Sequence, residues 1–511
     1  MIKPQHNKIS LVFNFLFSKS VLQVLIILTF IVFLFSMWNR FIYIDDAFFG
    51  EQAYWLAKDG VVKTVSLIDF LGCDIQLFSY HKFNILIGAG LIKIFGWSVT
   101  PLRVFTLILY FIFIAVFVQY SRKLLNANTL NQQILIGLFF LIANPLIVIF
   151  AFTYRPEIWV MLFGFISFVK LDQNINSKVS NKQAILSGFM AGLAFLTHLN
   201  GLIFLVAGAV LLLYRRQWQS FVWFSVAGFF TSILYFADLW QEGHFETWLY
   251  QLKNWPDNNA TNYLSGSAIE FAKNVVIKLS QEHQRFFWSP KVWGISSFFI
   301  LVLLFHFKRL VKIHTNLIIY VITLVLSLNI LGSQIAERFL IYIFPYLSLI
   351  ISYGLISILH EKRTALKFMF TILLIIQIVT VVISFVDIFN KNAPHVRITE
   401  NIFSRIPDKQ GLILTPYNMV FNTLDKYTLA SFKAFEYKEV AQGHAFSQSE
   451  FFKRADTLNI KTIVLPLPGF KNTDTGLDCF SDGIINDTSL YHPYYKGENY
   501  VILIRNKSDN Q

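Results

Sequence analysis

Long apolar runs constrain this 511-residue chain more than any other feature of its sequence. A helix needs roughly 20 apolar residues to cross the hydrocarbon core of a bilayer. With 55% hydrophobic residues, 14% charged residues and a mean hydropathy of +0.54, the composition excludes a soluble enzyme and a disordered scaffold. We predict eleven membrane-spanning helices, near residues 20–38, 101–120, 132–151, 157–170, 183–198, 200–214, 218–237, 293–307, 314–332, 339–357 and 366–388.

The basic residues indicate how these spans are oriented. Cytoplasmic loops collect Lys and Arg, whereas short translocated loops avoid them. With a cytoplasmic N-terminus, the predicted inner segments hold sixteen Lys and Arg, and the short outer turns hold only Arg155 and Arg338. We therefore predict an integral plasma (inner) membrane protein with three outer pieces, which are residues 39–100, residues 238–294 and everything after residue 388. Its active side would face the periplasm or cell exterior, and the endoplasmic reticulum would give the same topology with a luminal active side.

The chain changes character after the multi-spanning module of residues 1–388. From residue 391 onward, 14 Lys and Arg stand against 13 Asp and Glu, so nearly all of the chain's net charge of +13 lies among the apolar runs. Short runs typical of β-strands alternate with polar stretches that are compatible with helices. We predict that residues 389–511 form a small extracytoplasmic α/β domain with strands near residues 411–415, 461–465 and 500–504.

Two cysteines, Cys73 and Cys479, both fall in the predicted outer pieces. An oxidising compartment would permit a bridge between them. Because pairing cannot be read from the sequence, we interpret them as two unrelated thiols.

Two adjacent carboxylates, Asp45 and Asp46, follow the first span at the expected membrane surface. Residues 47–60 then show a short helical pattern with aromatic residues, and Gly60 is a suitable stop. A partly desolvated carboxylate can deprotonate a hydroxyl group near a lipid-borne substrate. In the structural alternative, Asp45 and Asp46 only cap this helix and offset its dipole.

Within the first outer piece, His81 and Lys82 stand directly before an apolar run at residues 84–95. This run is too short to span a membrane, and we predict a helix that lies in the interface. Lys82 could hold a phosphate at the start of this helix, or extend to the membrane surface as an ordinary interfacial lysine. His81 is a candidate metal ligand, although a single histidine is weak evidence for a metal site.

Three short outer turns are unusually polar for their depth. Arg155 and Glu157 occupy the first, His198 and Asn200 the second, and Arg338 the third. Ionisable groups at the ends of spans are costly to bury, so they pair or line a polar cavity. Each turn alone could be an interfacial anchor, but their occurrence on one side favours a shared cavity that also contains Asp45 and Lys82.

Together these motifs resemble the C-type glycosyltransferase superfamily. The nearest groups are the bacterial lipopolysaccharide glycosyltransferases and the aminoarabinose transferases, with the protein O-mannosyltransferases more distant. The similarity covers about residues 20–360. It rests on the acidic pair, the aromatic-rich helix ending at Gly60, the His81–Lys82 element, residues 94–103, Arg155 to Glu157, Gly192 to Gly201, and Arg338 to Leu340.

The resemblance implies roles for individual residues. Asp45 takes the place of the catalytic base, and Asp46 takes the second acidic position, where Glu is more usual. Lys82 matches the residue that contacts the donor phosphate in the aminoarabinose transferases. His81 stands where those enzymes carry a Glu that helps to bind a metal, and Phe83 replaces the customary Pro, so a divalent metal cofactor is left open.

The residues and the resemblance lead to the same predicted reaction. Asp45 would deprotonate an acceptor hydroxyl, which attacks the anomeric carbon of a polyprenyl-phosphate sugar and inverts its configuration. Cations would stabilise the departing phosphate, and neighbouring polar groups would orient the sugar. The cations are Lys82, Arg155 and Arg338, and the orienting residues are Glu157, His198 and Asn200.

The acceptor would be a lipid, a glycan or a protein, and the chain would not bind nucleic acid. The alternatives are a transporter or flippase of lipid-linked sugars, a non-catalytic partner of the same fold, and a polymerase or ligase acting on polyprenyl-linked glycans. A transporter would more naturally show inverted repeats and charges near the span centres.

Overall fold

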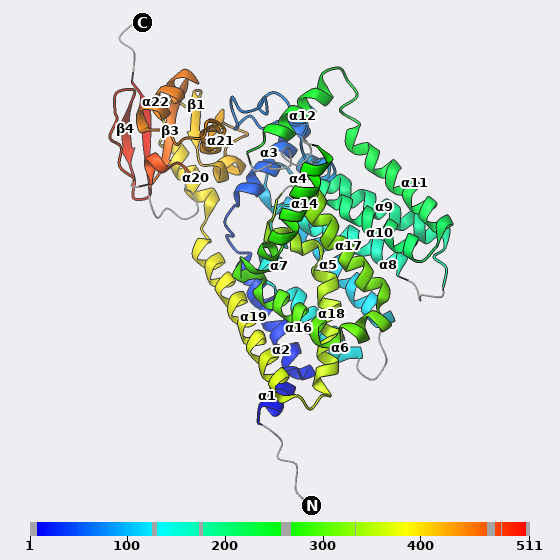
Figure 1. The fold of residues 1–511 in the computed structure, drawn as a ribbon. Coiled ribbons are helices and arrows are strands. Elements are labelled where there is room, and N and C mark those ends of the chain that lie inside the picture. The colour runs from blue at the N-terminus through cyan, green and yellow to red at the C-terminus, as the bar shows by residue number, and fades with distance from the viewer. Residues whose placement is uncertain are drawn as a thin grey trace, which may run out of the picture.

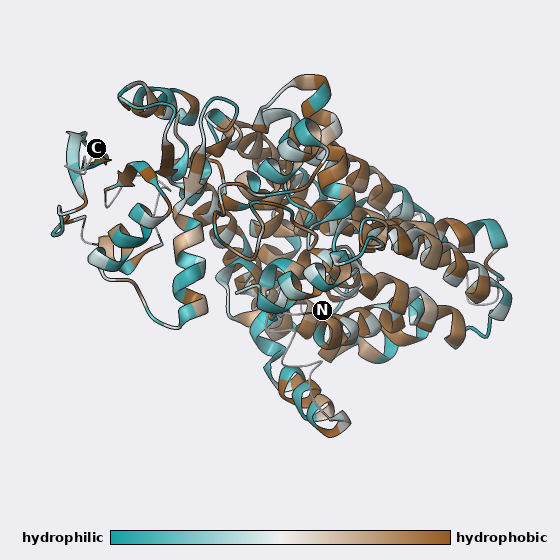
Figure 2. Ribbon diagram, turned by 90° about the horizontal axis from the view of Figure 1, so that it is seen from above, coloured by the Kyte–Doolittle hydropathy of each residue, from teal (hydrophilic) through white to brown (hydrophobic). Residues whose placement is uncertain are grey.

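The computed structural model describes residues 8–124, 130–172, 177–256, 267–332, 334–467, 476–481 and 483–506. It consists of a large helical bundle with a small domain containing a β-sheet at one end (Figure 1). Helix α1 (Lys8–Leu16), the first described element, lies at the opposite end of the bundle from this domain. Hydrophobic residues dominate the bundle helices, and hydrophilic residues gather at helix ends, on loops and in the small domain (Figure 2).

Within the described residues, five helical segments are long and apolar enough to cross a membrane. They comprise α2 (Lys19–Ser36), α5 (Val99–Leu124), α11 (Trp218–Ile233) with η2 (Leu234–Phe236), α16 (Pro290–Ile313), and α19 (Thr364–Lys391), the last continuing to Ser404. The other bundle helices are shorter. These are α1 (Lys8–Leu16), α6 (Leu130–Ile142), α7 (Pro145–Phe150), α8 (Glu157–Leu171), α9 (Asn181–Thr197), η1 (Leu199–Gly201), α10 (Leu202–Tyr214), α17 (Thr315–Leu331), η3 (Glu337–Tyr342) and α18 (Phe344–Leu359).

Each of the eleven predicted runs lies on helix, but not always on one helix. The run at 132–151 is broken because Asn144 caps a new helix, α7, which begins at Pro145. Its side chain accepts hydrogen bonds from the amides of Leu146 and Ile147 at 3.0 and 3.4 Å. The break brings the turn after α7 close to the first outer piece, which matters for the candidate site. The total of eleven spans and the cytoplasmic N-terminus stay predictions.

The first outer piece contains two helices, α3 (Ile44–Asp59) and α4 (Lys82–Phe95). As expected, α3 ends at Gly60, whose φ of +74° is a left-handed conformation that glycine adopts without strain. The second outer piece contains α12 (His244–Asn254), α14 (Ala268–Gln281) and α15 (His283–Phe287). Helices α3, α4 and α12 lie at the same end of the bundle as the small domain (Figure 1).

The small domain contains one mixed five-stranded sheet with the strand order β2-β1-β3-β5-β4. Strand β1 is parallel to β2 and β3, whereas β5 is antiparallel to β3 and β4. The elements are α20 (His395–Ser404), β1 (Leu412–Thr415), η4 (Tyr417–Asn422), β2 (Leu429–Ser431), α21 (Phe432–Gln442), α22 (Gln448–Thr457), β3 (Ile460–Pro466), η5 (Asp478–Phe480), β4 (Tyr491–Lys496) and β5 (Tyr500–Arg505).

The three strands predicted from the sequence are confirmed as β1, β3 and β5, which form the centre of the sheet. The two edge strands were not predicted. Strand β2 has only three residues, and β4 contains Pro493, which cannot donate a ladder hydrogen bond and lies beside an irregularity in register. Neither carries the continuous apolar run that marks a buried strand.

The sheet domain is docked directly on the first outer piece. Phe421 of η4 stacks on Trp97 with ring centroids 4.4 Å apart and packs against Gly50 of α3. The amide of Ser431 donates to the carbonyl of Ser66 at 2.8 Å. These contacts fix the domain over the N-terminal half of α3. Cys73 is buried, Cys479 is partly buried, and both are free thiols.

Candidate active site

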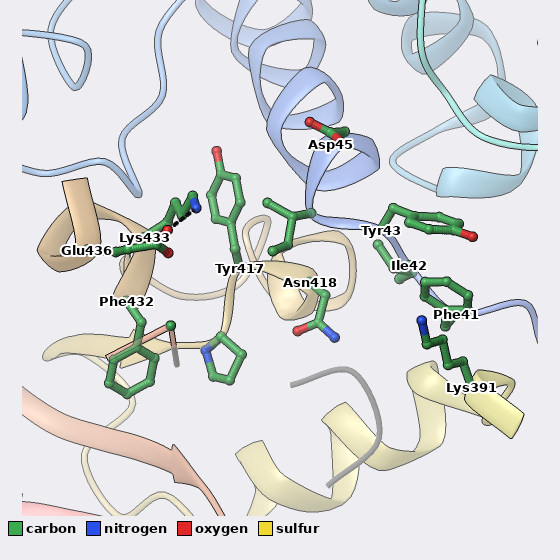
Figure 3. A pocket seen from close by; sticks show the side chains of 13 residues that line it. Phe41, Ile42, Tyr43, Asp45, Lys391, Tyr417, Asn418, Phe432, Lys433 and Glu436 are labelled. Atoms are coloured by element: carbon green, nitrogen blue, oxygen red, sulfur yellow. Dashed lines mark hydrogen bonds and ion pairs between the residues drawn. The ribbon is translucent and has the colours of Figure 1, made fainter. Parts of the chain in front are cut away.

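Asp45 lies in the first turn of α3, at the edge of a cavity between the bundle and the sheet domain. The cavity has a volume of about 460 Å³. Tyr43 and Asp45 lie on one wall, and Tyr417, Asn418 and Lys433 lie on the wall formed by the sheet domain (Figure 3). The side chain of Asp45 is 42% exposed, so solvent and a substrate can reach its carboxylate.

On its other side, Asp45 forms an ion pair with Arg155. Arg155 also binds Glu157, with Nη2 2.7 Å from Oε1 and Nε 3.1 Å from Oε2. This two-point contact fixes the plane of the guanidinium group. Because Arg155 and Glu157 are both buried, their attraction is weakly screened and they form a rigid support for the Asp45 carboxylate.

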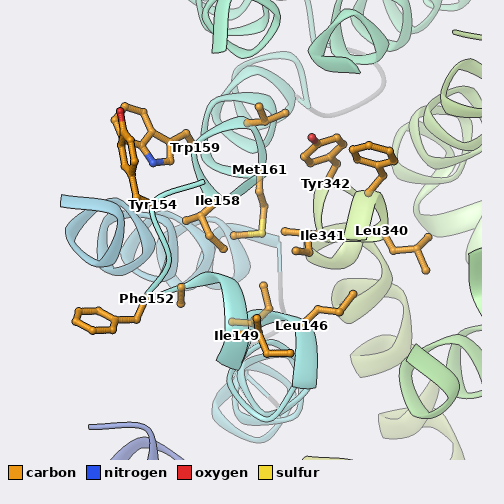
Figure 4. Close-up of a cluster of buried hydrophobic side chains, with 14 of the residues drawn as sticks. Leu146, Ile149, Phe152, Tyr154, Ile158, Trp159, Met161, Leu340, Ile341 and Tyr342 are labelled. Atoms are coloured by element: carbon orange, nitrogen blue, oxygen red, sulfur yellow. The ribbon is translucent and has the colours of Figure 1, made fainter. Parts of the chain in front are cut away.

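A buried hydrophobic cluster positions the Arg155 turn. It includes Ile149 of α7, Ile158 and Met161 of α8, and Leu340 and Ile341 of η3 (Figure 4). Arg155 lies between α7 and α8, and Arg338 lies in η3. The cluster therefore holds two turns that are almost 200 residues apart in sequence against each other.

His81 and His198 stack face to face beside these charges. Their ring centroids are 4.4 Å apart and their planes make an angle of 25°. Burial, reinforced by repulsion from Arg155, lowers the pKa of His81 to about 3. Burial, reinforced by repulsion from Arg338 and Arg155, also places the pKa of His198 well below its ordinary value. Both rings are neutral at physiological pH.

Asn200 and Arg338 complete this side of the site. The amide of Asn200 donates to Nδ1 of His198 at 3.0 Å, which leaves the proton of the neutral ring on Nε2. Among the described residues, the buried Nδ2 of Asn200 has no hydrogen-bond partner. Arg338 donates to Gln334 at 2.7 Å and lies 5.0 Å from the ring of Phe339. The next residue, Phe339, packs edge-on against the ring of His198 with centroids 5.7 Å apart, which places Arg338 beside the histidine pair.

Asp46 differs sharply from its neighbour Asp45. It is fully buried, and both of its oxygens accept hydrogen bonds. Oδ2 lies 2.5 Å from Nη2 of Arg103 and 3.1 Å from the amide of Tyr43, and Oδ1 lies 2.6 Å from the amide of Tyr154. This is the arrangement that the helix-capping alternative describes. Asp46 thereby fixes the start of α3 and the direction of Asp45.

Lys82 follows His81 but points to a different partner. Its Nζ lies 2.6 Å from Oδ2 of Asp238 and 3.0 Å from the carbonyl of Phe78. The ring of Tyr80 lies 3.7 Å from the same ammonium group, and the Tyr80 hydroxyl donates to Asp238 at 3.0 Å. Burial lowers the pKa of Lys82 to about 8, although Asp238 opposes this shift.

Two acidic residues of this region were missed in the sequence. Asp238 follows the predicted span at 218–237 directly, which is the signal that singled out Asp45 after the first span. Glu51 is fully buried in α3 and accepts hydrogen bonds from the Ser66 amide at 2.9 Å and the Tyr417 hydroxyl at 3.0 Å. No local pattern marks Glu51, because its partners come from a loop and from the sheet domain.

The described part of the chain contains no group of three or more His, Cys, Asp or Glu side chains that could hold a metal ion. Asp45, the carboxylate whose charge acts on His81, is bound to Arg155. In this arrangement the residues do not fit a metal site at His81.

Comparisons with known proteins place this geometry in a known fold. No protein-family model matches the sequence, and no curated protein matches it. The structure is similar to that of ArnT from Cupriavidus metallidurans bound to undecaprenyl phosphate, with a TM-score of 0.55, 12% identity, and coverage of 95% of this chain and 98% of that one.

The apo state of the same protein gives a TM-score of 0.55 and 11% identity, with coverage of 94% and 97%. The oligosaccharyltransferase from Archaeoglobus fulgidus, tethered to an acceptor peptide, gives a TM-score of 0.51 and 13% identity, with coverage of 88% of this chain and 70% of that one. The chain therefore shares its fold with ArnT and with this oligosaccharyltransferase.

Proposed function

We propose that this protein is a membrane glycosyltransferase that moves a sugar from a polyprenyl-phosphate donor to an acceptor hydroxyl group. The observation that carries the proposal is the position of Asp45. Its carboxylate is paired with the buried Arg155 on one side and faces an open cavity on the other. A base at such a boundary can meet an acceptor from the cavity while the donor phosphate lies among the cations.

The proposed reaction balances with the residues present. Asp45 takes the proton of the acceptor hydroxyl as its oxygen attacks the anomeric carbon. The bond from that carbon to the phosphate oxygen breaks, and its electron pair leaves with the polyprenyl phosphate. Attack from the opposite face inverts the anomeric configuration. The second pKa of a phosphate monoester is about 6, so no general acid is needed if cations compensate the charge.

Arg155, Arg338 and Lys82 are the proposed cations. Arg155 and Lys82 are paired with carboxylates in the structure, so donor binding would exchange a protein carboxylate for the phosphate. For Arg155 this exchange also frees the Asp45 carboxylate to act as a base. The neutral Nε2–H group of His198 and the free amide of Asn200 are proposed to orient the sugar.

The cavity in Figure 3 is the proposed entrance for the acceptor. The rings of Tyr43, Tyr417 and Phe432 offer flat apolar surfaces, and Asn418 and Lys433 offer polar groups. Four of these residues, Tyr417, Asn418, Phe432 and Lys433, belong to the sheet domain. This domain would therefore determine which acceptor binds. Sugars and other polar head groups with apolar faces suit such a lining.

The proposal is tested with purified protein in lipid vesicles and a panel of polyprenyl-phosphate sugars, with membrane extract as the source of acceptor. We expect release of free polyprenyl phosphate from one donor and a product of inverted anomeric configuration. Movement of a lipid-linked sugar across the bilayer with no release would instead support a transporter. No release and no movement with any donor would support a non-catalytic partner.

A further inference from the structure

A second cavity, of about 660 Å³, lies across the backbone of residues 40–43 from the candidate active site. Ile42 lines both cavities, but the second contains neither Asp45 nor Arg155. No part of the proposed reaction uses it. Its walls come from the segment after α2, the start of α5, the chain that leaves α19, and η4 of the sheet domain.

Three candidate membrane spans end at this cavity. The carbonyls of Ser36 and Trp38, at the end of α2, accept hydrogen bonds from the Asn392 side chain at 3.3 and 3.1 Å. The amide of Ala393 donates to the carbonyl of Asn39 at 3.0 Å. Helix α5 begins at Val99, which lines the same cavity. A bilayer crossed by these three helices would present its head groups at the level of this cavity.

The surface beside the cavity is suited to lipid chains. Phe35 is 69% exposed, Trp38 is 79% exposed, and Phe95 is 63% exposed. These large apolar side chains stand at the ends of α2 and α4. A lipid whose chains cover them would bring its head group to the cavity mouth.

Most of the charged side chains that line the cavity are basic, and two are acidic. Arg40 is buried in the inner wall, and its guanidinium donates to the carbonyls of Val148 and Ile149 at 3.0 and 3.1 Å. Arg397, in the first turn of α20, and Lys426, after η4, also line the cavity and are exposed. Within the described residues, no ion pair within 4.0 Å involves any of these three cations.

Polar groups and carboxylates complete the lining. Two buried ring nitrogens, Nε1 of Trp97 and Nε2 of His395, have no hydrogen-bond partner in the described part of the chain. A buried donor without a partner costs roughly 1–3 kcal/mol, so such groups usually serve a ligand or water. Glu400, one turn after Arg397 on α20, and Asp425, next to Lys426 in the chain, also line the cavity.

From these features we infer that the cavity binds the head group of a membrane phospholipid that carries both a phosphate and an amine. The phosphate lies among Arg40, Arg397 and Lys426, and the ring nitrogen of Trp97 donates to it. The amine lies beside Glu400 and Asp425. The lipid thereby joins the ends of α2, α5 and α19 to the sheet domain.

The test measures binding of short-chain lipids to the purified full-length protein. Four probes are compared. Phosphatidylethanolamine carries a phosphate and an amine, phosphatidic acid carries only a phosphate, and diacylglycerol carries neither. The fourth probe is inorganic phosphate. In the double variant Arg397→Ala/Lys426→Ala we expect both phospholipids to bind about tenfold or more weakly. In Glu400→Gln/Asp425→Asn we expect weaker binding of phosphatidylethanolamine alone. All four changes are at exposed side chains, so folding is retained.

The control is Lys409→Ala/Lys453→Ala, which removes two exposed charges of the sheet domain outside the cavity. Equal phospholipid binding by the wild type and the Arg397/Lys426 variant would overturn the inference. Inorganic phosphate that binds as tightly as the phospholipids would overturn the assignment to a lipid. The experiment measures lipid binding and not sugar transfer, so its result does not depend on the proposed reaction.

Discussion

Asp45 and Arg155 form an ion pair although they are 110 residues apart in the sequence. The same guanidinium group is bound to Glu157. The carboxylate of the proposed base is therefore fixed in position, but it is paired with Arg155 until another anion replaces it there. This relationship links donor binding to activation of the base.

Removing the guanidinium of Arg155 tests this link. We predict that Arg155→Gln lowers the rate of sugar transfer by about 10²–10³ and raises KM for the donor, because stabilisation of the phosphate is lost. Arg155→Lys keeps a charge without the two-point contact and recovers part of the loss. Arg363→Gln, at an exposed ion pair, is the control. Unchanged donor KM in Arg155→Gln would argue against a contact with the donor phosphate.

Lys82 gives the site a pH dependence. Its pKa, lowered to about 8 by burial, means that the cation is present below pH 8 and is lost as the pH rises through that value. We predict that KM for the donor rises between pH 7 and pH 9. Asp238→Asn removes the attraction that opposes the lowering of the Lys82 pKa, so the rise in KM begins at a lower pH. The control is Asp59→Asn, at the surface pair with Lys63, and identical pH profiles in the two variants would contradict the prediction.

Gly50 has no side chain, which lets the sheet domain pack closely against α3. A Cβ atom at Gly50 would come 2.1 Å from Cζ of Phe421, so Gly50→Ala must displace Phe421 from its stack on Trp97. We predict a loss of about 1–3 kcal/mol in the free energy of unfolding. Gly90→Ala, in α4, meets no atom within 4 Å and is the matched control. Thermal unfolding in detergent compares the two, and equal midpoints would contradict the docking contact.

Tyr417 joins the sheet domain to α3 through Glu51. We predict that Tyr417→Phe destabilises the docked domain by about 1 kcal/mol, because one buried hydrogen bond is lost. Burial already raises the pKa of Glu51, and loss of the Tyr417 hydrogen bond raises it further. Hydrogen exchange at η4 and α21 measures the effect. Tyr494→Phe, at an exposed ring of β4, is the control, and equal exchange rates in both variants would count against the contact.

Much of this structure was predictable because its signals are local. Apolar runs marked helices, and three short β-type runs marked the central strands β1, β3 and β5. The outer polar turns pointed to Arg155, His198 and Arg338, which the structure brings into one cluster. Charged groups near a membrane are costly unless they pair or line a polar cavity, so their presence in these turns predicted that the turns come together.

Other features depend on partners that no local pattern announces. The sequence treats Asp45 and Asp46 alike, whereas the structure buries Asp46 on Arg103 and leaves Asp45 accessible. Lys82 was expected to face the same space as Asp45, but it is paired with Asp238 from the second outer piece. These differences arise from side-chain directions at helix starts, and the direction of a side chain is set by tertiary packing.

The most direct test of the proposed function compares Asp45→Asn with Asp59→Asn, at the other end of the same helix. The measurement is the rate of polyprenyl phosphate release in the presence of donor and acceptor. We predict that Asp45→Asn lowers this rate by about 10²–10⁴ with normal folding, and that Asp59→Asn leaves it unchanged. A rate in Asp45→Asn equal to that of the wild type would contradict the role of Asp45 as the base.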